Sequence, residues 1–414
     1  MAKREIWSFF TGAMGLDLGL EKVGLAPTLA NELDAACCET IRLNRPEVTL
    51  IEEDVSRLNA KRLRAEREFD GDVFLMVGGP PCQSFSSGGK RSALSDPRGN
   101  LVYQYLRLID EVRPKYFIFE NVANFTTAAL QHRPIADRPG QHWSLKRYEE
   151  EGSLIDDGRA PMMEHELSGS AIREVLEVVR QLNYHVNFGV LDAADYGAPQ
   201  HRLRFVMLGS RDWPAPNLPK PTHGSPEGAL KPFQTVRDVI WGLKDNPGPG
   251  SMYTDAVRRF FALVPEGKNW RALPESLRRE ALGGSYEAGG GKTGFYRRLA
   301  WDRPAPTITG RANRKGSALC HPEDVRPLST LECAAIQGFP SDWKFSGSMN
   351  SQYQQIGNAV PVELGAAIGR AIKNHRPAKS LVVRADYEEM LHLAVKRLRA
   401  AARNKRPTVA ATTM

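Results

Sequence analysis

One cysteine of this chain stands where an inert, buried thiol would be unexpected. Residues 77–86 read Val-Gly-Gly-Pro-Pro-Cys-Gln-Ser-Phe-Ser, and the strand-like segment 72–77 leads into them. The glycines and prolines must turn the chain sharply before Cys82, which places its thiol at a strand end, where open α/β sheets bind their ligands. A thiol is nucleophilic only when its surroundings favour the thiolate. Cys82 is therefore a candidate nucleophile, and an unreactive loop cysteine is the alternative.

Two other polar groups accompany apolar strands. Glu120 ends the strand-like segment 116–120, where a carboxylate is costly unless a partner or a polar ligand meets it. Arg202 and Arg204 alternate at the start of another strand, so their side chains are expected on the same side. Taken singly, a structural acceptor and a pair of salt-bridge partners are the ordinary interpretations. Together with Cys82 they supply a nucleophile, an acid and cationic donors for one planar heterocycle.

Strands and helices that could position these groups alternate over the first half of the chain. The patterns predict strands at 6–10, 28–32, 72–77, 116–120, 184–191 and 204–209, and helices at 16–23, 35–42, 101–112 and 172–182. Such alternation implies an α/β fold with parallel strands joined by right-handed crossovers. A polar insertion with prolines and arginines interrupts it between Thr126 and Met163.

The character of the chain changes after Arg211. Prolines at 214, 216, 219, 221, 232 and 247 break it into short pieces, which predicts a second, irregular and strand-poor domain. A glycine cluster between 283 and 294 includes Gly291-Lys292-Thr293. A phosphate-binding loop would need glycine at 286, where Tyr286 stands, so this segment is expected to be an ordinary loop.

Composition is that of a soluble globular protein. Of 414 residues, 41% are hydrophobic and 25% charged, and no apolar run approaches the roughly 18 residues of a membrane span. The segment Met1 to Glu5 lacks a secretory signal. Five cysteines, odd in number and without paired metal-ligand spacing, suit free thiols in a reducing cytoplasm and predict no metal site.

The net charge of +8 resides in the C-terminal part. From Arg370 onward eleven lysines and arginines face three acids, and 11 − 3 accounts for the whole excess. Apolar residues at helical spacing predict an amphipathic helix here: Tyr387, Met390, Leu391, Ala394, Val395 and Leu398. Its charged face is either simply solvated or a phosphate-binding arm.

These residues resemble the DNA cytosine-5 methyltransferases, and the resemblance covers Trp7 to Gly369 with the motifs in the family's order. Phe10 to Gly19 is similar to the cofactor loop, including Phe10, Gly12 and Gly15. Glu32 resembles the ligand of the ribose hydroxyls of S-adenosylmethionine, and Asp54 with Val55 the pair that contacts adenine. Pro81, Leu101, Asn358 and Val360 complete the cofactor site that the resemblance implies.

The remaining motifs concern the base and the DNA. Pro80-Pro81-Cys82-Gln83 resembles the catalytic motif, Glu120-Asn121-Val122 the motif that protonates the base, and Gln200 to Arg204 the one that orients it. Arg303 to Ile308 resembles the motif that braces the recognition domain. Ser86 to Arg98 has the composition of a loop that closes over DNA, with Ser86 and Arg98 as contacts.

The resemblance implies a mechanism in which Cys82 adds to C6 of cytosine, so that C5 can attack the activated methyl group. Glu120 would protonate or share a proton with N3, Arg202 would hold O2, and Arg204 would support Glu120 or the ring. The cytosine must be flipped out of the duplex. Sequence alone does not identify the base that removes the C5 proton.

Two departures from the family pattern concern the cofactor loop. Ser8 stands where the family usually has an acid, and Met14 where it has a glycine. The Met14 side chain must then point away from the cofactor or narrow its pocket. The insertion between Thr126 and Met163 is longer than is common in the family.

The expected organisation is a doubly wound, Rossmann-like S-adenosylmethionine-binding domain over 1–212, completed by about 346–380. A target-recognition domain and hinge would occupy 213–345, and a basic helix with a disordered tail 381–414. The expected partner is double-stranded DNA, for a monomer in the bacterial cytoplasm that associates with the nucleoid through DNA. The sequence does not decide between an enzyme with a cognate restriction endonuclease and an orphan methylase without one. The alternatives are a tRNA methyltransferase, whose Cys-Phe-Thr tripeptide is missing here, and a non-catalytic DNA-binding relative.

Overall fold

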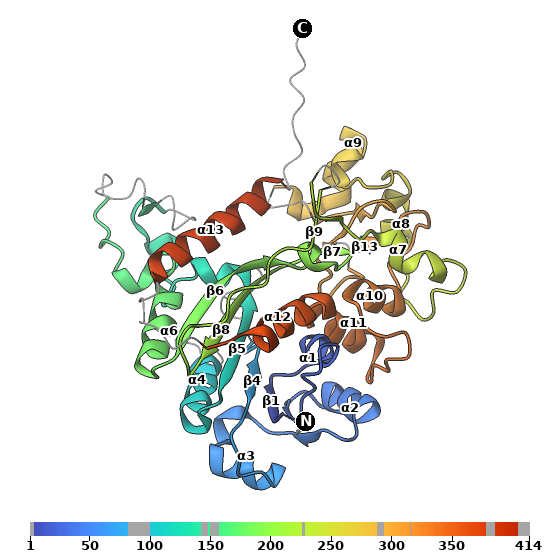
Figure 1. Ribbon diagram of the computed structural model, residues 1–414. Coiled ribbons are helices and arrows are strands. Elements are labelled where there is room, and N and C mark those ends of the chain that lie inside the picture. The colour runs from blue at the N-terminus through green and yellow to red at the C-terminus, as the bar shows by residue number, and fades with distance from the viewer. Residues whose placement is uncertain are drawn as a thin grey trace.

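A seven-stranded sheet organises the first half of the molecule (Figure 1). The computed structural model describes residues 4–81, 100–141, 148–149, 157–225, 228–287, 294–314, 316–377 and 386–404. The predicted site residues Cys82, Ser86 and Arg98 lie outside these ranges. In spatial order the strands are β3 (Thr49–Ile51), β2 (Leu29–Asn31), β1 (Ile6–Phe9), β4 (Leu75–Gly78), β5 (Tyr116–Val122), β8 (Leu203–Ser210) and β6 (His185–Asp192).

Helices cover both faces of this sheet, as the alternation predicted. On one face Trp7, Phe117 and Phe205 pack with α4 (Asn100–Val112) and α6 (Ser170–Gln181). On the other face Ile6 and Ile118 pack with α1 (Gly15–Glu21) and α12 (Val362–Asn374). Because alternate residues of each strand point to opposite faces and both faces are covered, the central strands are mostly apolar, with Ser8, Glu120 and Arg204 among the exceptions. The doubly wound α/β class is confirmed.

One prediction about this sheet is wrong. Strand β8 runs antiparallel to both β5 and β6, whereas all strands were expected to be parallel. Only a short segment, 193–202, joins β6 to β8, and a parallel connection would need a crossover of about a dozen residues or more. The patterns also missed the short strand β3 and helix α3 (Ala60–Arg67), while α2 (Ala35–Asn44) extends two residues beyond its expected end.

The second half contains two smaller cores. Phe261, Trp270 and Tyr296 centre one of them, formed by α8 (Asp255–Ala262), α9 (Glu275–Leu282) and neighbouring segments. The other joins Met14 and Leu18 of the N-terminal part to four helices from later in the chain. These are α7 (Val236–Ile240), α10 (Thr330–Gln337), α11 (Met349–Asn358) and the start of α12. The regular strands here are two residues long, such as β11 (Arg297–Arg298) and β13 (Leu319–Cys320).

These cores bear on the domain division. Residues of α10, inside the predicted range 213–345, pack with Met14 rather than with the core around Phe261. The division at 212 and 345 stays a prediction. The smaller unit around Phe261 draws on residues from Tyr253 to Tyr296 and on Cys320, whereas Leu299, Trp301 and Ile308 pack with the core that contains Met14.

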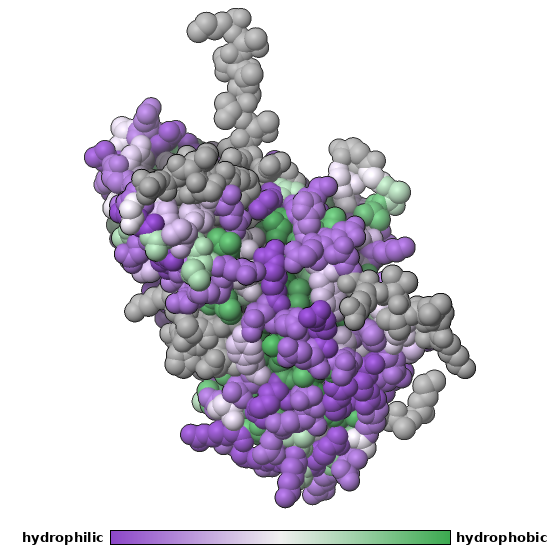
Figure 2. Space-filling view, turned by 90° about the vertical axis from the view of Figure 1, so that its left-hand side faces the viewer, coloured by the Kyte–Doolittle hydropathy of each residue, from purple (hydrophilic) through white to green (hydrophobic). Residues whose placement is uncertain are grey.

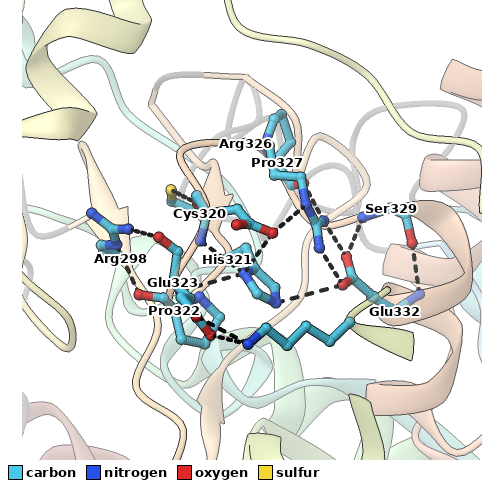
Figure 3. A network of polar contacts seen from close by, with 11 residues as sticks. Arg298, Cys320, His321, Pro322, Glu323, Arg326, Pro327, Ser329 and Glu332 are labelled. Atoms are coloured by element: carbon cyan, nitrogen blue, oxygen red, sulfur yellow. Dashed lines mark hydrogen bonds and ion pairs between the residues drawn. The ribbon is translucent and has the colours of Figure 1, made fainter. Parts of the chain in front are cut away.

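A mostly buried polar network stabilises the segment 320–332, which leads into α10 (Figure 3). Arg326 donates to both oxygens of Glu332, at 2.7 and 2.8 Å, and Glu332 also caps α10 through Ser329. The ring of His321 lies beside them, fully buried, and its Nδ1 accepts from the backbone N–H groups of Glu323 and Asp324. Burial lowers the pKa of His321 and keeps it neutral.

Hydrogen bonds of Arg133 join the two ends of the insertion. Arg133 binds both carboxylate oxygens of Glu166 and donates to the carbonyl oxygens of Ala160 and Pro161. The two ends of the insertion therefore lie side by side, and it leaves the fold without disturbing β5 or α6. No helix in the described ranges is long and apolar enough to cross a membrane.

Candidate active site

The carboxylate of Glu120 lies between two strands at the carboxyl end of β5. Antiparallel pairing sets Val122 opposite Arg204 of β8, so Arg204 reaches back to Glu120 with Nε 2.8 Å from Oε1. Both side chains are almost buried, at 11% exposure. Burial raises the pKa of Glu120, and the charges of Arg204 and Arg202 lower it in part. The carboxyl group can therefore hold or release a proton nearer neutrality than an exposed glutamate.

Arg202 contacts backbone carbonyl groups of two later segments. It is buried, and its guanidinium donates to the carbonyl oxygens of Ile308 and Gly357, with a longer contact to that of Asn358. Both terminal nitrogens are thus engaged with backbone, and only Nε lacks a partner among the described residues. That Arg202 holds the base stays a prediction. In the structure its guanidinium joins three chain segments, and Arg204 is the arginine beside the acid.

The chain that leads to Cys82 passes directly over Glu120. Asn121 donates from Nδ2 to the carbonyl oxygen of Pro80, at 3.3 Å. A Cβ on Gly79 would lie 3.0 Å from Glu120 Oε2, so only glycine fits there without a shift. This described segment ends at Pro81, one residue before the candidate nucleophile. No separate role was predicted for Asn121, which orients this turn.

The loop after β1 closes on Glu32 at the end of β2. The backbone N–H of Gly12 donates to Glu32 Oε2 at 2.6 Å, and those of Leu33 and Asp34 donate to Oε1. Gly12 has a φ of 55°, a conformation that glycine adopts without strain. A Cβ on Gly12 would meet no atom within 4 Å, so the space beside the loop is open. Phe10, with a φ of 56°, turns the same loop.

The packing of this loop shows where the Met14 side chain points. Met14 is buried and packs with Leu18 and the core of α7 and α10, away from the open side of the loop. Its φ of 66° is unusual for a residue other than glycine. Next to it, Gly15 lets α1 approach the segment after α11, because a Cβ there would lie 2.4 Å from the carbonyl oxygen of Val360.

A buried acid, Asp17, lies beside this loop. It contacts Ser8, which stands where the family usually has an acidic residue. Asp17 of α1 is 2% exposed and forms a hydrogen bond with Ser8. Burial, partly opposed by that hydrogen bond, raises the pKa of Asp17 to about 7. Its Oδ1 has no partner within the described part of the chain. The pattern of apolar residues gave no sign of this acid, because an acidic residue in a short helix is expected on its exposed side, whereas every residue from Gly15 to Leu20 is buried.

The other predicted cofactor residues lie in a turn after β3 and at the ends of two helices. Asp54 caps a short turn by accepting from the N–H of Ser56, and Val55 beside it is buried. Leu101 is half-buried at the start of α4, and it packs against the core beneath Phe10. Asn358 ends α11 and is exposed, two residues before Val360.

Two buried glutamines link these segments to one another. Gln200 donates to Gln337 Oε1 at 2.8 Å and accepts from the N–H of Ile308. Gln337 in turn donates to the carbonyl oxygens of Ile356 and Ala359. The segment before Arg202 is thereby tied to the one that carries Asn358 and Val360. Sequence reasoning missed Gln337, which lies in a helix without any motif that we had recognised.

Comparisons with known proteins give related sequences over most of the chain. The sequence model described as C-5 cytosine-specific DNA methylase matches residues 5–133 and 160–374, so it leaves out most of the insertion and all of the C-terminal helix. The Type II methyltransferase M.PspPI of Psychrobacter is 36% identical over 88% of this chain and 77% of its own length. M.Sau96I of Staphylococcus aureus, another Type II methyltransferase, is 34% identical over 89% and 76%.

Solved structures share the fold. A candidate DNA modification methyltransferase encoded within an Escherichia coli prophage superposes with a TM-score of 0.59, covering 90% of this chain and 99% of its own, at 22% identity. A DNMT2 protein of Spodoptera frugiperda reaches 0.54 at 16% identity, covering 90% and 100%. At such identities the likeness concerns the fold alone.

Proposed function

Because this chain belongs to the family of C-5 cytosine-specific DNA methylases, we propose that it transfers a methyl group from S-adenosylmethionine to C5 of a cytosine within a specific double-stranded DNA sequence. The observation that supports this reaction most directly is the Glu120–Arg204 pair, nearly buried and adjacent to the turn that leads to Cys82. An acid held beside a candidate nucleophile suits addition to a pyrimidine ring.

The residues around the first loop fit the cofactor. The open space beside Gly12 and the carboxylate of Glu32 offer room and an acceptor for ribose hydroxyls. Phe10, Gly15, Asp54, Val55, Pro81, Leu101, Asn358 and Val360 would complete the site. When bound, S-adenosylmethionine supplies an electrophilic methyl group. The protein must orient the cofactor, exclude water and present the base.

The protein's own residues carry the remaining steps. The thiolate of Cys82 forms a bond to C6 of a flipped cytosine, and Glu120 gives or shares a proton at N3 as negative charge develops on the ring. Arg204 holds Glu120 and can reach the same base, while Arg202 fixes the backbone around it. The bound cofactor would supply the methyl group to C5 as the bond from its sulfur to that methyl group breaks, which would leave S-adenosylhomocysteine. Loss of the C5 proton and breakage of the Cys82–C6 bond restore the aromatic ring.

Among the two alternatives, neither a tRNA methyltransferase nor a non-catalytic relative is favoured. The similar curated proteins are Type II methyltransferases, which supports a role in DNA modification. We propose that the protein acts as a monomer in the bacterial cytoplasm, where a cognate restriction endonuclease would be its counterpart. Bases would be recognised through loops of the unit around Phe261, because sequence is read from base edges.

The test is bisulfite sequencing of genomic DNA from a host without cytosine-5 methylation that expresses this chain. We expect methylated cytosines within one recurrent sequence, and none with Cys82→Ala. Duplex DNA from this sequence with 5-fluorocytosine at the target should trap the wild-type protein covalently but not Cys82→Ala. Unmethylated DNA from cells that contain folded protein would overturn the proposal.

A further inference from the structure

The C-terminal helix α13 (Tyr387–Asn404) runs beside the last strand of the sheet and in the same direction (Figure 1). Near its start, the ring of Tyr387 lies 6.1 Å from that of Phe188 in β6. Further along, Arg397 forms an ion pair with Asp195, just past the end of β6. Since β5 and β6 both pair antiparallel with β8, they are parallel to each other. The second half of α13 therefore lies at the carboxyl edge of the sheet, where Glu120 stands.

The inner face of α13 packs directly behind the catalytic segments. Ala394 is buried, and with Leu398 it belongs to a small apolar cluster that contains Ala123 and Leu203. Ala123 follows the segment that carries Glu120, and Leu203 lies between the two arginines. These contacts fix the helix to the backbone that positions the site.

The outer face of this half is basic. Residues 392, 396 and 399 follow the spacing of one helix face, and they are His392, Lys396 and Arg399, all exposed. Lys396 and Arg399 form no ion pair with any residue that the structure describes, whereas Arg397 is paired with Asp195. Figure 2 views the molecule from the side on which α6 and α13 lie, and hydrophilic residues dominate that face.

The order of charges along α13 has a simpler explanation as well. Asp386, Glu388 and Glu389 stand at its start and the cations in its second half, an arrangement that favours the helix dipole. That effect alone would stabilise the helix without any ligand. It does not account for unpaired cations at the same edge of the sheet as the active site. The helix also lies beyond residue 374, where the match to the family model ends.

We propose that Lys396 and Arg399 bind phosphates of the DNA backbone beside the target cytosine, so that α13 extends the DNA-binding surface of this chain. The inference rests on the proposed function, because it requires DNA as the substrate. The contacts would be electrostatic and independent of sequence, like most phosphate contacts. They would raise affinity and leave the methylated sequence unchanged.

The test compares two double variants that remove the same charge. Lys396→Gln/Arg399→Gln neutralises the proposed surface. Arg57→Gln/Lys61→Gln neutralises two exposed cations near and in α3, which lies far from α13 in Figure 1. Fluorescence anisotropy with a labelled non-specific duplex measures affinity at several salt concentrations, and the melting temperature reports on folding.

For the α13 variant we expect the slope of log affinity against log salt to flatten by about 0.9 for each phosphate that the protein no longer binds, and affinity at 0.1 M salt to fall by roughly tenfold or more. The control should keep the wild-type slope. Equal slopes for both variants and the wild type would overturn the inference, as would an equal fall in affinity in both variants. A wild-type protein that neither binds nor methylates DNA would instead contradict the proposed function.

Discussion

Arg204 and Glu120 form an ion pair at the carboxyl end of the central strands, with Nε 2.8 Å from Oε1. The two residues belong to adjacent antiparallel strands, so the register of β5 and β8 sets their distance. Burial raises the pKa of Glu120, while the guanidinium opposes that shift. The strand pairing therefore controls the proton affinity of the acid that the mechanism needs.

Replacing Arg204 with Met should raise the pKa of Glu120 further, because burial remains and an opposing positive charge is removed. The limb of the pH profile of kcat/KM that reports on this carboxyl should move to higher pH, and kcat should fall by on the order of a hundredfold. Steady-state assays across pH measure both. Arg211→Met, which breaks the exposed pair with Asp72, is the control. An unmoved limb would separate Arg204 from the titration of Glu120.

Replacing Glu32 with Gln should weaken S-adenosylmethionine binding by roughly tenfold or more, because charge-assisted hydrogen bonds contribute on the order of 1.5–3 kcal/mol each. The same change weakens the hydrogen bond that the backbone N–H of Gly12 donates to the side chain at position 32. Calorimetric titration with the cofactor measures the change in affinity, and Glu47→Gln, an exposed acid nearby, is the matched control. Cofactor affinity equal to that of the control would remove Glu32 from the site.

Replacing Gln337 with Met should lower cofactor affinity about fivefold and reduce kcat, because the carbonyl groups of Ile356 and Ala359 lose their donor. Gln337→Glu keeps an acceptor for Gln200 but not the donor, so it should not restore binding. Gln354→Met, on the exposed face of α11, controls for the removal of an amide. A fall in stability without any change in cofactor KM or kcat would make Gln337 a purely structural residue.

Replacing Asp17 with Asn should change how stability depends on pH. In the folded state the pKa of Asp17 is raised to about 7, whereas the unfolded chain releases this proton near 3.8. Its contribution is fully present below about pH 3.8 and is lost as pH rises through 7, up to about 4 kcal/mol. The stability of Asp17→Asn relative to wild type should therefore increase from pH 4 to 7.5. Melting temperatures across pH test this, with the exposed Asp70→Asn as control; parallel curves would contradict it.

The sequence predicted most helices and strands around the sheet. The helices show apolar residues at helical spacing over two or more turns, and the buried strands show short apolar runs. It could not predict the direction of β8, since the apolar pattern of a strand is the same in either direction and only the short connection from β6 decides. Strand β3 was missed because it lies at the edge of the sheet with only Ile51 buried, whereas β2, of the same length, is buried throughout.

The candidate site divides in the same way. Among residues in recognisable tracts, Glu120 contacts Arg204 and Glu32 contacts Gly12, while their roles toward base and cofactor stay predictions. The alternation of Arg202 and Arg204 does not show what surrounds each of them, and only the structure shows that Arg202 contacts the backbone of Ile308 and Gly357. Gln337 and Asp17 act through contacts with segments far along the chain or beneath a loop, and no local pattern records such contacts.

The position of α13 has a consequence for solubility. Strand β6 is eight residues long and ends the sheet, and such a strand offers unpaired N–H and C=O groups to another chain. With α13 in place, Leu391 and Ala394 are buried and the strand is accompanied along its length. A chain cut before Asp386 would expose both this edge and an apolar strip beside it. Such a truncated protein should self-associate through β6, so the helix protects the sheet from aggregation.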